Sequence, residues 1–228
     1  MSVDIITIPL GFDQCYVLKG DGVIAVDAGA PKKVEAFARA LDTVAISPHD
    51  VKLVVLTHGH WDHIGSASEI KSLTGAALAM HRSEAQWLEN SLTPLSPGVT
   101  PWGRVFNALH KVFMPLIKVP PAKVDLAFGD DGLSLVDFGI PGRVLHTPGH
   151  SSGSVTVLLD TGEAFVGDLA MNKLPLRLSP GLPIFADDPA AVVSSWKMLI
   201  ELGASTVYPA HGKPFPVAVI EKAISRAA

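Results

Sequence analysis

The chain has 228 residues, 48% of them hydrophobic, and 18 Lys and Arg against 22 Asp and Glu give a formal net charge of −4. This length can bury a large core, while the absence of any basic run or basic–aromatic interleaving argues against nucleic acid as a partner. No stretch approaches the ~18 apolar residues of a membrane span. The first residues lack the basic and apolar regions of a secretory leader, so we expect a cytoplasmic location.

The first part of the chain, about 1–90, alternates short apolar runs with helix-like segments. The apolar run 51–56 is typical of a buried strand. Pro31 favours a helix that begins there, because the fixed φ of proline suits the first turn of a helix. The sequence predicts strands near 3–9, 15–19, 22–27, 51–56 and 76–80, and helices near 31–41, 66–73 and 82–90.

The last part, about 124–228, has a similar organisation. Asp187, Asp188 and Pro189 form an N-terminal signal for a helix near 188–202. The predicted strands lie near 124–128, 133–137, 143–147, 154–159, 163–166 and 205–208, and a last helix near 215–226. Two similar halves of interleaved strands and helices predict a single α/β domain. Its expected form is a four-layer sandwich with helices outside two facing sheets.

Between these halves, 91–123 is predicted to be a helical insertion. Its apolar residues recur at three- and four-residue steps, as in one stripe of a helix: Trp102, Val105, Phe106, Leu109, Val112, Phe113 and Leu116. Pro115, Pro120 and Pro121 should end or kink this helix. The stripe could pack on its own domain, cover an active site as a lid, grip an apolar substrate or form a homodimer contact, since long insertions are often functional.

The stretch His58-Gly59-His60-Trp61-Asp62-His63 carries the strongest chemical signal. It places three imidazoles and one carboxylate in six consecutive positions after a predicted strand. A neutral imidazole offers one ring nitrogen to a borderline cation, and a carboxylate supplies charge. Side chains two apart in an extended segment lie on the same side, so His58 and His60 can bind one ion. Asp62 and His63 then point elsewhere and could serve a second ion beside the first.

Three later segments each place a potential ligand directly after a predicted strand. His150 follows a Thr-Pro-Gly turn, Asp168 follows a glycine, and His211 precedes one. In layered α/β folds, sites usually lie at the C-terminal edges of strands. This placement makes all three residues candidates for the same site as the early histidines.

The order of these motifs resembles the metallo-β-lactamase superfamily of dinuclear hydrolases: HxHxDH, then His after Thr-Pro-Gly, then Gly-Asp, then His-Gly. The resemblance spans nearly the whole chain and implies the αββα fold, with metals in a cleft along the sheet edges. It implies that a first metal is bound by His58, His60 and His150, a second by Asp62, His63 and His211, and that Asp168 bridges the two. Asp27 matches a family residue that supports the metal loop, although a simple turn residue is the other interpretation.

Two divalent cations about 3.5–4 Å apart can share one water and lower its pKa towards about 7, so that hydroxide attacks a carbonyl or phosphoryl centre. Asp62 is then the candidate catalytic residue that orients the hydroxide and carries its proton. Imidazole-rich ligation favours zinc, with iron and manganese as alternatives. For substrate binding the candidates are Lys173 and Arg177, in an apolar proline-rich loop, and His110, beside the apolar stripe.

The predicted function is hydrolysis of a small ester, thioester or lactone. By the resemblance, true β-lactamases with this motif generally lack the bridging Asp, and glyoxalase II-type thioesterases carry a longer C-terminal region for glutathione. The apolar acyl pocket of quorum-quenching lactonases would suit 91–123. The enzyme alternative is a mononuclear iron dioxygenase acting on a persulfide. A metal-binding protein without turnover is less favoured. Three protein ligands per ion leave a coordination position open, whereas structural zinc sites have all positions filled by the protein.

Overall fold

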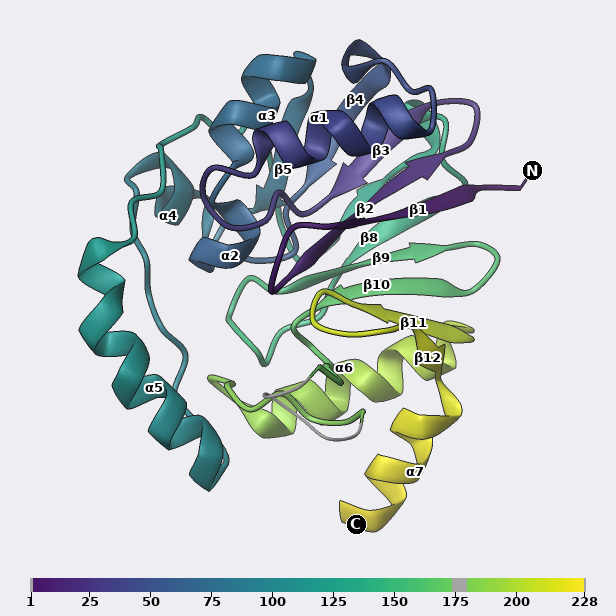
Figure 1. Cartoon of the computed structure of the whole chain (residues 1–228). Helices are drawn as coiled ribbons and strands as arrows, with labels where there is room; N and C mark the ends of the chain where they lie inside the picture. The colour runs from purple at the N-terminus through teal and green to yellow at the C-terminus, as the bar shows by residue number, and fades with distance from the viewer. Residues whose placement is uncertain (1, 174–179, 228) are drawn as a thin grey trace.

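The computed structural model describes residues 2–173 and 180–227, and within them the strands form two six-stranded sheets (Figure 1). The first sheet has the order β1-β2-β3-β4-β5-β6 and the second the order β12-β11-β10-β9-β8-β7. Strands of the first sheet are β1 (Asp4–Pro9), β2 (Gln14–Lys19), β3 (Val23–Val26), β4 (Val51–Val55), β5 (Ala77–His81) and β6 (Leu126–Phe128). Those of the second are β7 (Leu133–Ser134), β8 (Gly142–His146), β9 (Val155–Leu159), β10 (Glu163–Gly167), β11 (Thr206–Pro209) and β12 (Phe215–Pro216).

Helices lie outside both sheets and in the segment between them (Figure 1). They are α1 (Val34–Thr43), α2 (Trp61–Ile64), α3 (Ala67–Thr74), α4 (Ala85–Glu89), α5 (Pro101–Phe113), α6 (Pro189–Glu201) and α7 (Ala218–Ala227). Three short 3-10 turns span Pro48–Asp50, Met114–Leu116 and Val136–Phe138. No helix in the described residues is long and apolar enough to cross a membrane.

The pairing of the strands brings several strand ends to one edge. In the first sheet β1, β2 and β3 pair antiparallel, whereas β3 to β6 pair parallel. In the second sheet β10 and β11 form a parallel pair, and the other pairs are antiparallel. Parallel strands end at the same edge of their sheet, so the segments after β4, and after β10 and β11, can meet there.

Three apolar cores hold the layers together. The sheets face each other through residues such as Ile24 and Leu53 from the first and Phe165 from the second. Phe37 of α1 and Ile70 of α3 pack on the outer face of the first sheet. On the second sheet, Trp196 of α6 and Ile220 of α7 pack on the outer face. The four-layer αββα sandwich is therefore confirmed.

Two predicted boundaries in the first and last helices are wrong. The helix predicted from Pro31 begins at Val34, because Lys32 has a φ of 66°, which a right-handed helix does not accommodate. The last helix, predicted at 215–226, also begins later in the structure than predicted, for a different reason. Phe215 pairs with Val207 and extends the sheet as β12, so α7 begins only at Ala218.

The strand predicted at 133–137 also ends early. Only Leu133 and Ser134 pair with β8. The chain then forms the 3-10 turn Val136–Phe138, which ends at Gly139 with a φ of 74°. The extended backbone is already lost at Leu135, whose φ of −101° and ψ of 0° begin this turn, so the strand cannot continue to 137.

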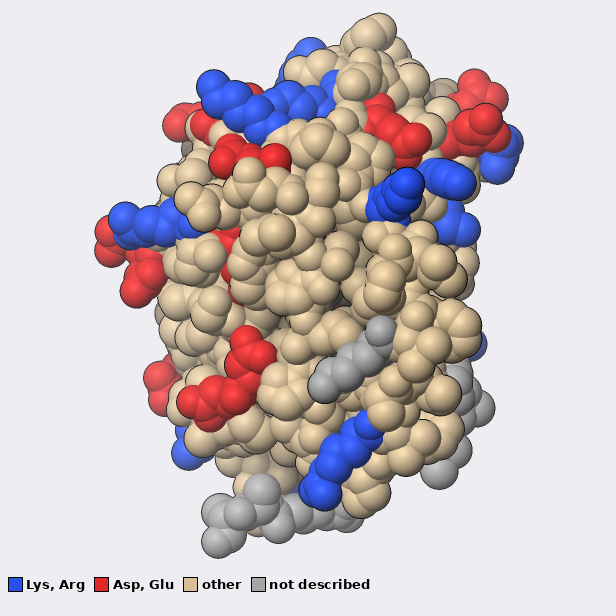
Figure 2. All heavy atoms as spheres, turned by 90° about the vertical axis from the view of Figure 1, so that its left-hand side faces the viewer, with Lys and Arg blue, Asp and Glu red and all other residues tan. Residues whose placement is uncertain are grey.

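Helix α5 matches the predicted insertion helix, but most of its apolar stripe faces solvent. Thr100 caps the helix by accepting a hydrogen bond from the Gly103 N–H, and the helix ends before Pro115. The exposed residues are Trp102, Val105, Leu109, Val112, Phe113 and Leu116. On this side of the molecule, charged residues lie mainly towards the edges (Figure 2). The homodimer contact through 91–123 stays a prediction.

Candidate metal centre

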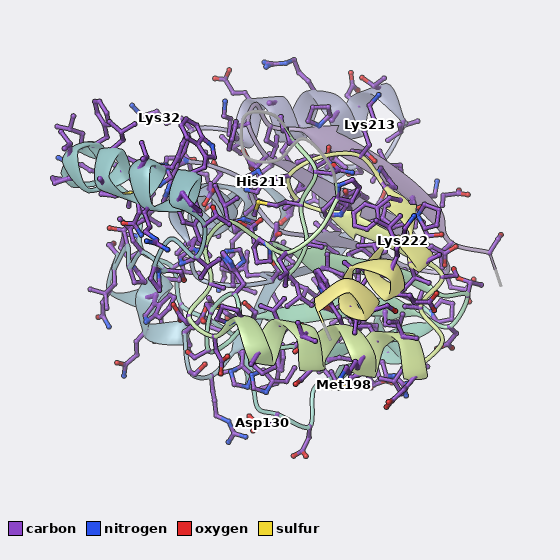
Figure 3. All side chains as sticks on the ribbon, turned by 90° about the horizontal axis from the view of Figure 1, so that it is seen from below. Lys32, Asp130, Met198, His211, Lys213 and Lys222 are labelled. Atoms are coloured by element: carbon purple, nitrogen blue, oxygen red, sulfur yellow. The ribbon has the colours of Figure 1, made fainter. Side chains whose placement is uncertain are left out.

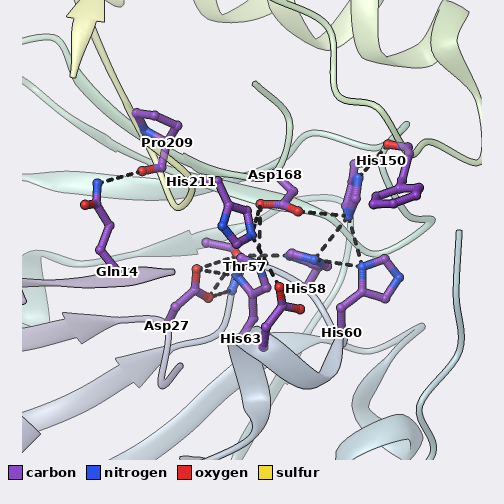
Figure 4. A network of polar contacts seen from close by, with 12 residues as sticks. Gln14, Asp27, Thr57, His58, His60, His63, His150, Asp168, Pro209 and His211 are labelled. Atoms are coloured by element: carbon purple, nitrogen blue, oxygen red, sulfur yellow. Dashed lines mark hydrogen bonds and ion pairs between the residues drawn. The ribbon is translucent and has the colours of Figure 1, made fainter. Parts of the chain in front are cut away.

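The strand ends bring all seven predicted ligands together (Figure 4). His58 and His60 follow β4, Asp62 and His63 lie on α2, His150 follows β8, Asp168 follows β10, and His211 follows β11. A hydrogen bond joins the two sheets directly beside the cluster: the Val155 N–H donates to the Thr57 carbonyl oxygen at 2.8 Å. Six of the seven are buried and Asp62 is partly buried.

The first group consists of His58, His60 and His150. Their facing atoms are His58 Nε2, His60 Nδ1 and His150 Nε2, which lie 3.0 to 3.2 Å apart. The opposite nitrogen of His150 donates to the Phe185 carbonyl oxygen at 2.9 Å, so its Nε2 carries a lone pair when the ring is neutral. Nitrogens bound tetrahedrally at about 2.0–2.1 Å from one zinc ion would lie roughly 3.3 Å apart. The spacing of this group therefore fits one ion.

The second group consists of Asp62, His63 and His211. His211 Nε2 lies 3.3 Å from Asp62 Oδ2, and its Nδ1–H donates to the Phe12 carbonyl oxygen at 3.2 Å. His63 Nδ1–H donates to Asp27 at 2.8 Å. In both neutral rings the proton thus sits on the far nitrogen, and the nitrogen that faces the cluster is free to bind a cation.

Asp168 lies between the two groups. Its Oδ1 is 3.4 Å from His63 Nε2 and 3.3 Å from His211 Nε2, while its Oδ2 is 3.7 Å from His150 Nε2. Each carboxylate oxygen thus faces a different group. Asp168 is placed as a bridging ligand would be.

The donor set fits metal ions. In the described residues, His63 Nε2 and Asp168 Oδ1 are buried without any hydrogen-bond partner. With neutral rings, imidazole lone pairs and carboxylate oxygens would face each other, and unpaired buried acceptors of this kind are costly, so a proton or a metal ion must lie between them. A cation between them would satisfy both, and nitrogen-rich donors suit zinc-like ions.

The two groups differ in electrostatics. Burial and the neighbouring His150 lower the pKa of His60 to about 3, and burial likewise lowers the pKa of His58. Burial also acts to lower the pKa of His211, but the carboxylates of Asp168 and Asp62 outweigh it and raise this pKa to about 9. His58 and His60 are therefore neutral without a metal, whereas His211 binds a proton in place of a cation.

Asp27 supports the second group. Its carboxylate accepts hydrogen bonds from the Thr57 N–H at 2.7 Å, from the Thr57 hydroxyl and from His63 Nδ1–H (Figure 4). Asp27 adopts a φ of 65°, a conformation that only a few non-glycine residues take. These contacts favour the metal-loop interpretation of Asp27 over that of a simple turn residue.

A pocket opens at the cluster, and five of the seven predicted ligands line it. Four aromatic side chains line its walls: Phe12, Trp61, Phe106 and Phe185. His110 of α5 also lines this pocket, and its ring packs edge-on against Phe106 with centroids 5.0 Å apart. Burial lowers the pKa of His110, which keeps the ring neutral near pH 7.

The two cationic substrate candidates are placed differently. The Lys173 ammonium donates to the carbonyl oxygens of Gly11 and Phe12, at 3.0 and 2.6 Å, and lies over the Phe12 ring. It thus holds the segment whose Phe12 carbonyl oxygen binds His211. Arg177 lies outside the described residues. A role for either in substrate binding stays a prediction.

Sequence reasoning missed several residues at the site. Ser96 donates to the His150 carbonyl oxygen at 2.9 Å and lies in a segment without any motif. The Phe185 carbonyl oxygen accepts the His150 hydrogen bond, a backbone contact with no sequence signal. Trp61 could have been found, because it sits inside the histidine motif.

Another group of ligand-type residues lies elsewhere: His81, Asp130 and His146. His81 Nε2 lies 3.2 Å from Asp130 Oδ1, an acceptor, so this nitrogen carries the proton, and Ser83 bonds the other nitrogen. The rings of His81 and His146 stack with centroids 4.2 Å apart and planes 7° apart. One ion cannot lie in the planes of two parallel, stacked rings, so this group does not fit a metal as it stands.

Comparisons with known proteins agree with this geometry. A family model described as the metallo-beta-lactamase superfamily matches residues 8–211. An uncharacterised protein of Mycobacterium leprae is 31% identical over 172 residues, 72% of each chain. A probable metallo-hydrolase of Bacillus subtilis is 25% identical over 199 residues, 87% of this chain and 79% of that protein.

A solved structure gives the same result for the fold. The B3 metallo-beta-lactamase BLEG-1 superposes with a TM-score of 0.70 at 23% identity, covering 94% of this chain and 95% of that chain. At this identity the likeness concerns the fold alone. With the family match over most of its length, the chain belongs to the metallo-β-lactamase superfamily.

Proposed function

We propose that this protein is a metal-dependent hydrolase of a small ester, thioester or lactone. The observation that carries this proposal is the position of Asp168, with one oxygen towards each of two ligand groups in the floor of an open pocket. The superfamily binds divalent metals. A relative in Bacillus subtilis is named a probable metallo-hydrolase, which agrees with hydrolysis as the reaction type.

Two zinc ions, when bound, would supply a nucleophile at neutral pH and polarise the substrate carbonyl. The protein's own residues would then orient the reactants. Burial acts to raise the pKa of Asp62, but the His211 hydrogen bond and the neighbouring His63 lower it to about 2. Asp62 also lines the pocket, so its ionised carboxylate can accept a hydrogen bond from the attacking water and receive its proton.

The pocket walls favour a small, largely uncharged substrate. Trp61, Phe106 and Phe185 provide apolar aromatic surface, and the described lining contains no Lys or Arg. His110 is the polar group of the α5 wall, and its neutral ring can donate one hydrogen bond to an ester or lactone oxygen. Such a lining, mostly apolar with a few polar groups, is typical of small-molecule sites.

The second group separates the proposed function from its enzyme alternative. A mononuclear iron dioxygenase needs only one set of ligands, whereas Asp62, His63 and His211 form a complete second set with two rings held by hydrogen bonds. A metal-binding protein without turnover is disfavoured by the open pocket that contacts both groups.

Elemental analysis of the purified protein, paired with hydrolysis of chromogenic esters, thioesters and acyl lactones, tests the proposal. We expect about two zinc ions per chain and hydrolysis of at least one of these classes, lost on chelation and restored by zinc. One iron per chain with oxygen uptake on a persulfide would contradict it. Bound metal without hydrolysis across the panel would also contradict it.

A further inference from the structure

Glu84 is a fully buried carboxylate beside the first ligand group, between β5 and α4, and its side chain is 0% exposed. Its Oε2 accepts a hydrogen bond from the Gly59 N–H at 2.7 Å. Its Oε1 accepts a hydrogen bond from the Gly153 N–H at 2.6 Å. Gly59 lies between His58 and His60 in the segment after β4, and Gly153 lies three residues after His150 in the segment after β8. One carboxylate therefore joins segments that follow strands of different sheets.

Both glycines leave room for this carboxylate. A Cβ on Gly153 would lie 2.6 Å from Ser83 Oγ and 2.8 Å from Glu84 Cγ and Cδ. A Cβ on Gly59 would lie 2.4 Å from a ring carbon of Trp87 and 3.2 Å from Glu84 Oε2. Contacts below 3.0 Å force a neighbour to shift, so a side chain at Gly153 would press on both Ser83 and Glu84. Because Gly59 in the His-Gly-His motif has no side chain, its N–H can approach Glu84 closely enough to donate a hydrogen bond.

We propose that Glu84 is a positioning residue that sets the mutual spacing of His58, His60 and His150. Hydrogen bonds from N–H groups to a buried carboxylate are short and strong, and here they fix the backbone on both sides of the first group. Without them the two segments would be joined near the group mainly through the Thr57–Val155 hydrogen bond. Second-layer contacts of this kind typically change metal affinity 10- to 100-fold.

The effect should be confined to the first group. The hydrogen bonds that the Glu84 carboxylate accepts come from Gly59, Ser151 and Gly153, in the segments that carry His58, His60 and His150. His63 and His211 are instead oriented by Asp27 and by the Phe12 carbonyl oxygen. The inference rests on the proposed metal centre but does not require turnover.

The test measures zinc affinity of each group separately by chelator competition. A His211→Ala background leaves the first group intact, and a His60→Ala background leaves the second intact. Glu84→Gln keeps one acceptor oxygen but turns an NH₂ group towards a backbone N–H. We expect it to weaken zinc binding 10- to 100-fold in the His211→Ala background. In the His60→Ala background we expect a change below about twofold, because Glu84 does not contact the second group.

Glu89→Gln is the matched control, because Glu89 on the same helix accepts a hydrogen bond from the Val124 N–H away from the site. It should leave both affinities unchanged. Equal weakening in both backgrounds would show a general structural role and overturn the inference. Unchanged affinity of the first group in Glu84→Gln would also overturn it.

Gly153→Ala provides a second route if Glu84→Gln does not fold. This variant keeps the carboxylate but presses on Ser83 and on the Glu84 side chain. We expect the same selective loss at the first group, and wild-type zinc affinity there would overturn the inference. The outcome is separable from the proposed function, because a wild-type protein that binds zinc but hydrolyses nothing would contradict only the latter.

Discussion

The molecule contains two clusters of histidine and aspartate, and they differ in how their rings are held. In the central cluster, the far nitrogens of His63, His150 and His211 donate to Asp27 or to carbonyl oxygens, so a metal ion, or a proton in its place, binds at the facing nitrogens. In the other cluster, both nitrogens of His81 have partners in Ser83 and Asp130, and its ring stacks on that of His146.

Burial separates the two clusters further. Figure 3 shows Asp130 at the edge of the molecule and His211 in its interior; their side chains are 78% and 2% exposed. Water can solvate Asp130, so nothing is left unsatisfied there. In the central cluster His63 Nε2 and Asp168 Oδ1 have no partner among the described residues. Ligand-type residues in proximity are thus insufficient, and a buried setting in which the ligand atoms converge without other hydrogen-bond partners distinguishes the candidate metal centre.

The largest expected effect is on Asp168. Asp168→Ala removes the carboxylate that faces both groups, and we expect loss of bound metal and of turnover. His60→Ala should also abolish turnover, but it should lose only the metal of the first group. The measurement is elemental analysis together with hydrolysis of the best substrate. Asp130→Ala is the control and should retain both properties. Full activity of Asp168→Ala, or metal loss in Asp130→Ala, would contradict the distinction between the clusters.

A smaller effect is expected from Asp27→Asn. The amide can keep an acceptor for Thr57 but presents an NH₂ group or a weaker acceptor to His63 Nδ1–H. We expect zinc affinity of the second group to fall 10- to 100-fold, with the first group unaffected. Chelator competition in the His60→Ala and His211→Ala backgrounds measures the two affinities. An unchanged zinc affinity of the second group would mean that Asp27 does not orient His63.

The two groups should also respond differently to pH. Without a metal the pKa of His211 is raised to about 9 by Asp168 and Asp62 against the effect of burial, so below pH 9 a cation must displace its proton. The second group should therefore lose affinity by about tenfold per pH unit for each displaced proton as the pH falls. Burial and the neighbouring His150 lower the pKa of His60 to about 3, so zinc displaces no proton from this ring of the first group. Zinc titrations between about pH 5 and 7 measure how the zinc affinity of each group changes with pH. The same change per pH unit in both groups would contradict this difference.

The smallest effect is expected at the pocket wall. His110→Phe keeps an aromatic ring against Phe106 but removes the ring nitrogens. Loss of one hydrogen bond of about 0.5–1.5 kcal/mol predicts a roughly 2- to 10-fold lower kcat/KM. Steady-state kinetics measure it, and Leu109→Ala on the exposed face of α5 is the control. Metal content should not change, and an unchanged kcat/KM would exclude a substrate contact by His110.

The fold and the convergence of the ligand candidates could be predicted from the sequence for a shared reason. Candidates such as His58, His150 and His211 follow apolar strands, and strand periodicity places the strand ends without knowledge of packing. The errors lie where backbone conformation overrides composition, as at Lys32, which has a positive φ, and at Leu135, where the chain leaves the extended conformation.

Other features could not be derived from the sequence. Glu84 binds backbone groups 25 and 69 positions away in the chain. Backbone donors carry no residue type, so no motif can signal such a contact. The orientation of the nitrogens in the centre likewise depends on carbonyl oxygens such as those of Phe12 and Phe185, which only the folded chain brings into place.

The most direct measurement is anomalous X-ray diffraction at the zinc edge from crystals grown with zinc. We expect two peaks, one within coordination distance of His58, His60 and His150, the other of Asp62, His63 and His211, with Asp168 in contact with both. We expect none at His81, Asp130 and His146. A single peak in the central cluster, or a peak at the outer cluster with none in the centre, would contradict the account.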